Sequence, residues 1–64
     1  MVFIVTIAVP AEEFRRSLEG VKGVRFVREL PPGRVVVTAA GSAVVTALPA
    51  VEAVVEDRLE HLTD

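Results

Sequence analysis

Apolar and polar residues form four strand-like runs along the chain, separated by two helix-like segments. The runs near residues 2–9 and 34–39 are apolar at almost every position and rich in β-branched residues. Strands of this kind are covered on both faces, so we expect these two at the centre of a sheet. The run near residues 23–30 mixes arginines with apolar residues, as an edge strand does. The run near residues 50–57 then takes the other edge.

Helix signals lie between these runs. Pro10 suits the first turn of a helix near residues 10–19, which carries glutamates at its start. Ser42 offers a cap for a short helix near residues 42–48, which a proline ends. A Pro-Pro-Gly sequence marks the turn between the second and third runs.

The order of these elements predicts the fold class. Strand, helix, strand, strand, helix, strand indicates an α+β fold of the ferredoxin-like βαββαβ type, a four-stranded antiparallel sheet with two helices on one face. A chain of 64 residues has room for one hydrophobic core, so residues 1–64 are expected to form a single domain. The second sheet face would be open. Because the central runs are apolar on both sides, we expect that face to bind a partner.

Composition narrows the function classes. The chain is 52% hydrophobic and 25% charged, as folded proteins are, and its net charge is −2. It has no cysteine, and its one histidine, His61, lacks companion ligands, so we expect neither a disulfide nor a metal or other cofactor. The arginines are dispersed, so we expect no nucleic-acid partner. The apolar run at the start is too short to span a membrane.

Catalysis is not expected. A catalytic hydroxyl needs an oriented base nearby, whereas His61 lies in the terminal tail and Ser17 and Ser42 are expected on a helix surface and at a helix cap. An RNA-binding sheet of the same topology would use aromatic side chains on its central strands, and the run 34–38 has none. Phe26 with its neighbouring arginines is better explained by core packing and edge-strand solubility.

The segment from Leu48 to Leu62 resembles the end of the propeptide and inhibitor domains of subtilisin-like serine proteases. In that family a short helix ends at a proline, a valine-rich strand follows, and an acidic pair leads into an extended tail with a histidine. The run from Phe3 to Ile7 is similar to the family's first strand, and residues 24–38 fit its hairpin. The resemblance therefore covers nearly the whole chain.

The resemblance implies a mode of protease inhibition. The family's sheet lies on two parallel surface helices of the protease, and acids near the end of the last strand cap the N-termini of those helices. Asp57 matches one capping acid, whereas the other falls on Val55, which cannot accept hydrogen bonds. Glu56, next to it, is the candidate substitute.

The family's tail enters the protease cleft like a reaction product. Without gaps, Glu60, His61, Leu62 and Thr63 fall on the last four residues before the cleavage point. A frame shifted by one places Leu59 in the fourth subsite and Leu62 in the primary pocket, which suits apolar pockets better. Both frames stay open.

We therefore expect an inhibitor of a subtilisin-like serine protease, monomeric when free, that can also serve as a folding template for its enzyme. It would be either a free-standing inhibitor, cytoplasmic if the chain is complete, or a secreted propeptide cut from a longer precursor. The alternative is a ferredoxin-like structural or regulatory domain that self-associates through its open sheet face.

Overall fold

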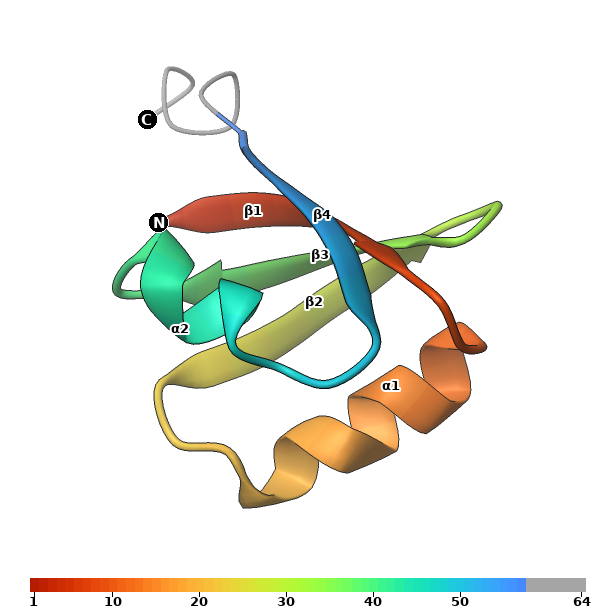
Figure 1. Ribbon diagram of the computed structural model, residues 1–64, viewed down its shortest axis with the longest axis horizontal. Coiled ribbons are helices and arrows are strands. Elements are labelled where there is room, and N and C mark those ends of the chain that lie inside the picture. Colours follow the sequence, from red (N-terminus) through yellow and green to blue (C-terminus); the bar gives the residue numbers. More distant parts are fainter. Residues whose placement is uncertain (58–64) are drawn as a thin grey trace.

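The computed structural model describes residues 1–57 of the 64-residue chain, in which strands and helices alternate in the predicted order (Figure 1). The elements are β1 (Val2–Ile7), α1 (Ala11–Ser17) continued by the 3-10 turn η1 (Leu18–Gly20), β2 (Val24–Leu30), β3 (Arg34–Ala39), α2 (Ser42–Thr46) and β4 (Val51–Glu56).

The strands form one antiparallel sheet in the order β2-β3-β1-β4. The two nearly continuous apolar runs, β1 and β3, occupy its centre, and β2 and β4 form its edges. The α+β fold and the ferredoxin-like βαββαβ arrangement are thereby confirmed. A strand that is apolar on both faces buries the most apolar surface in the middle of a sheet, which explains why the pattern alone predicts which strands are central and which are edges.

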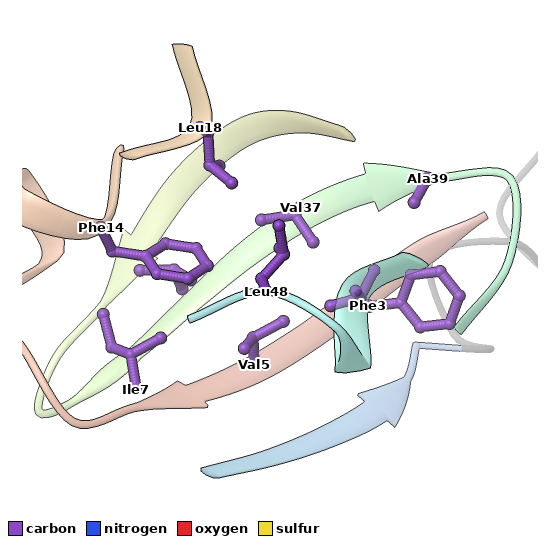
Figure 2. Packing of buried hydrophobic residues seen from close by; sticks show 10 residues of the cluster. Phe3, Val5, Ile7, Phe14, Leu18, Val37, Ala39 and Leu48 are labelled. Carbon is purple, nitrogen blue, oxygen red and sulfur yellow. The ribbon is translucent and has the colours of Figure 1, made fainter. Parts of the chain in front are cut away.

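Both helices cover the same face of the sheet. Phe14 and Leu18 from α1 and η1, and Val45 and Leu48 from α2 and the turn after it, are buried in one cluster with the side chains of β1 and β3. Figure 2 shows the rings of Phe14 and Phe3 at opposite ends of this core. The strand residues of the cluster are Phe3, Val5, Ile7, Val35, Val37 and Ala39.

The starts of the helices differ in detail from the prediction. Gly41, not Ser42, is the N-cap of α2, and no side-chain cap is formed there. Ser42 is the first helical residue, and its carbonyl oxygen accepts a hydrogen bond from the Thr46 hydroxyl at 2.6 Å. Pro10 is likewise the N-cap of α1 and precedes its first turn. Because the α2 segment lacks charged side chains, its position depends on the burial of Val45 and Leu48.

Two irregularities in strand pairing decide which side chains share a face. Between β2 and β3, Phe26 pairs with Val37 and Arg28 with Val36, so Val27 is an extra residue in the edge strand. Between β1 and β4, Thr6 pairs with Ala53 and Ile7 with Val51, so Glu52 is extra. Each bulge reverses the alternation of side chains beyond it.

Candidate docking face

The face opposite the helices, here called the open face, is defined by Val2, Ile4 and Thr6 of β1 and by the residues that pair with them. These three alternate with the core residues of β1 and are half-buried. Cross-strand partners project from the same side of a sheet, so the pairing register gives the composition of the whole face.

The middle of the open face is apolar. Ile4 pairs with Val36 on one side and with Val55 on the other. Val36 is only 3% exposed although it lies outside the core cluster, whereas Val55 on the edge strand is 60% exposed. We call Ile4, Val36 and Val55 the apolar stripe. The half-buried apolar side of the central strands that the sequence predicts is therefore present, and its most accessible residue is on β4.

One side of the open face carries arginines. Arg34 pairs with Thr6 of β1, and on β2 Arg25 pairs with Thr38 and Arg28 with Val36. All three are exposed. We call Arg25, Arg28 and Arg34 the arginine row. Within residues 1–57, no ion pair engages any of these guanidinium groups.

Sequence reasoning missed this row. Arg25 and Arg28 are three residues apart, so strict strand alternation would put them on opposite faces. The bulge at Val27 brings them to the same face. The sequence indicates this bulge only by the two consecutive apolar residues that interrupt the alternation in Val-Arg-Phe-Val-Arg, residues 24–28.

The two candidate helix-capping acids are separated by the sheet. Glu56 pairs with Phe3, so it lies on the helix-covered side, at the exposed edge. The Asp57 backbone N–H donates to the Val2 carbonyl oxygen at 2.8 Å, which continues the strand by one residue and turns Asp57 to the open face, beside Val55. Of the two, only Asp57 lies on the open face.

The remaining candidate residues of the tail, Leu59, Glu60, His61, Leu62 and Thr63, lie outside the described residues.

The aromatic residues all lie away from the open face, since Phe3 and Phe14 are buried and Phe26 packs partly buried against the same core. Phe26 is therefore on the other side of β2 from Arg25 and Arg28. The open face has no aromatic ring on which a base could stack.

Other kinds of site leave few traces in the part of the chain that the structure describes. There, no group of three or more His, Cys, Asp and Glu residues could hold a metal ion, and the core contains no buried polar side chain. No helix in residues 1–57 has the length and apolar character needed to cross a bilayer. A surface hollow of about 430 Å³ lies at one end of the sheet, where Arg25 and Thr38 of the open face form part of its wall.

Comparison of the chain with protein-family models, curated proteins and solved structures finds no match.

Proposed function

We propose that this domain inhibits a subtilisin-like serine protease by docking its open face on the enzyme and placing its C-terminal tail in the active-site cleft. The observation that carries the proposal is the layout of the open face. An apolar stripe crosses the sheet, and Asp57, the last described residue before the tail, lies at the end of the same face.

Each part of the open face has a physical role in such a complex. Burial of Ile4, in the middle of the apolar stripe, against an apolar surface would contribute about 25 cal/mol per Å² of area removed from water. A carboxylate such as Asp57 is favoured at a helix N-terminus, where unpaired backbone N–H groups and the helix dipole attract negative charge. An extended tail in the cleft would add backbone hydrogen bonds and fill pockets with alternate side chains.

Rigidity favours the proposed mode of binding. The open face is built on four paired strands backed by a single core, so docking requires no ordering of the sheet. A preorganised surface loses less conformational entropy on binding, and more of the contact energy appears as affinity. Stabilisation by a bound partner also suits a chain of only 64 residues, which has room for one small core.

Self-association remains the alternative, because the same apolar stripe could cover a second copy. The two functions predict different behaviour in the absence of any protease. The inhibitor should sediment as a monomer at micromolar concentration, and the structural domain should sediment as a dimer.

The test is an inhibition assay with purified subtilisin-like proteases, a small chromogenic peptide substrate and the full chain. We expect competitive inhibition with a stoichiometry of one chain per active site. Inhibition of none of the enzymes, together with a stable dimer in sedimentation, would replace the proposal by the alternative.

A further inference from the structure

The open face has a charge pattern that an apolar docking surface alone does not explain. Three arginines line its β2 and β3 side, beside the apolar stripe, and Asp57 occupies a corner near the end of β4. We propose that the protease surface opposite the arginine row carries carboxylates, and that these carboxylates of the partner determine which protease is bound. This inference rests on the proposed function and specifies the chemistry of the partner.

The distribution of acids shows that the arginine row is a local feature. The chain has a net charge of −2, yet the described carboxylates mostly lie away from the open face. Those of α1 and η1, Glu12, Glu13 and Glu19, belong to the helix layer. Glu29 and Glu56 pair with the core residues Val35 and Phe3, which puts them on the helix-covered side. Among the residues whose side is given by the pairing register, the open face thus carries three arginines and one carboxylate, that of Asp57, on a protein that is negative as a whole.

Desolvation then decides what the partner must provide. A docked surface would remove water from the guanidinium groups that flank the stripe, above all Arg28, which is next to Val36. A buried guanidinium without a counter-charge is strongly unfavourable, because its donors lose their water and gain no acceptor. Carboxylates on the partner compensate for the lost hydrogen bonds to water, since a guanidinium binds a carboxylate through two parallel hydrogen bonds.

A second copy of this chain fits the row poorly. In a face-to-face pair with β2 on β2, the arginine rows of both copies would meet and repel each other. With β2 on β4, each row would face Val55, Ala53 and Asp57, which supply one carboxylate for three arginines. A different protein with several acidic side chains satisfies the row better than either arrangement.

The experiment neutralises the row and compares it with an equal change elsewhere. The test variant combines Arg25→Gln, Arg28→Gln and Arg34→Gln. The control variant combines Arg15→Gln, Arg16→Gln and Lys22→Gln, which are exposed positions in α1 and the turn before β2 and give the same net charge. A third variant, which combines Arg25→Lys, Arg28→Lys and Arg34→Lys, keeps the charge of the row.

Inhibition constants of a protease inhibited by the wild-type chain are measured at low and high salt. We expect the test variant to inhibit about tenfold more weakly than the control variant at low salt, since the row flanks the docked stripe and its charge pairs, which are only partly desolvated there, each contribute modestly. The difference between the two variants should shrink at high salt, because the Debye screening length falls to roughly 3 Å at 1 M. The lysine variant should retain most of the salt dependence. Thermal unfolding of each variant confirms that it is folded.

The outcomes separate the inference from the proposed function. If the wild-type chain inhibits and the test and control variants inhibit equally well at every salt concentration, the acidic partner surface is refuted and the inhibitor function stands. If the wild-type chain inhibits no subtilisin-like protease, both fall. Binding of the wild-type chain to single-stranded RNA, lost in the test variant, would assign the row to nucleic acid and overturn the inference.

Discussion

At the scale of single residues, Asp57 and Glu56 offer a sharp comparison, because neighbours in sequence lie on opposite faces of the sheet. Asp57→Asn should weaken protease inhibition by roughly tenfold to a hundredfold, since a hydrogen bond to a charged group contributes about 1.5–3 kcal/mol. The backbone N–H that donates to Val2 is kept in this variant, so the strand pairing persists. Inhibition constants for the two chains measure the effect.

Glu56→Gln is the matched control, with the same loss of one charge at the adjacent position. It should inhibit as well as the wild-type chain, because its side chain lies on the helix-covered side. Equal weakening by both variants would point to net charge, and weakening by Glu56→Gln alone would move the capping role to that residue.

Ala50 provides a test of local backbone strain. It has a φ of 66°, in the left-handed region, where a residue with a Cβ costs about 1–2 kcal/mol. Ala50→Gly removes this strain but makes the unfolded chain more flexible, which costs about 0.4–1 kcal/mol. We expect a small net stabilisation, seen as a higher urea midpoint with an unchanged slope.

Ala47→Gly is the control for this substitution. Ala47 is the C-cap of α2 with φ of −78°, so glycine relieves nothing there and only adds flexibility. It should lower the urea midpoint. If both alanines respond alike to glycine, backbone strain at Ala50 does not limit stability.

At the scale of elements, β2 shows what the amino-acid pattern can and cannot predict. Its edge position follows from charged residues mixed with apolar ones, and its turn to β3 from Pro-Pro-Gly, where Gly33 has a φ of 71°. The bulge at Val27 could not be predicted, because any residue can be the extra one and the pairing register depends on β3. The arginines are dispersed along the sequence, and sequence reasoning therefore missed the row that three of them form on the folded sheet.

The other edge strand, β4, permits a test that distinguishes helix capping from apolar docking. Val55 is 60% exposed and lies on the open face, one alternation from Asp57, so the two side chains would be about 7 Å apart. Under the proposed function, Val55→Asp supplies the second capping acid and should tighten inhibition by about tenfold. This corresponds to about 1.5 kcal/mol, the lower end of the range for a hydrogen bond to a charged group. The inhibition constant measures this gain.

Val55→Thr is its control, since it keeps the β-branched shape and adds no charge. It should inhibit like the wild-type chain. Under self-association, Val55→Asp should weaken binding between the two copies, because its carboxylate would be buried in the apolar stripe. The dimer would then dissociate. Weaker inhibition by Val55→Asp would mean that Val55 contacts an apolar surface of the protease.

At the scale of the whole molecule, the architecture was predictable because each level of the sequence agrees with it. The two most apolar runs are central, the charged run is an edge, and the helices bury one stripe each. The function is less constrained by these patterns, since one fold supports many binding sites and the site depends on a few exposed residues. The resemblance was enough to propose Asp57 as a capping acid, whereas the side of the sheet on which Asp57 lies is known only from the pairing of β4 with β1.

Deletion of residues 59–64 should separate inhibition from folding. The core extends from Phe3 to Leu48, and the last described strand hydrogen bond, from Asp57 to Val2, is retained. The thermal midpoint of the free domain should therefore change by less than about 4–8 °C, the shift that 1 kcal/mol produces in a domain of this size. Inhibition should fall by roughly a hundredfold or more, because the cleft contacts of a product-like tail are lost.

A shorter deletion, of residues 63 and 64 alone, serves as control and selects the frame of the tail. If Leu62 occupies the primary pocket, this chain still ends with its pocket residue in place and should inhibit nearly as well as the full chain. If Thr63 occupies that pocket, inhibition should drop sharply, because the residue next to the catalytic centre has been removed. Full inhibition by the chain that lacks residues 59–64 would refute the product-like mechanism, and unfolding of that chain would show that the tail belongs to the fold.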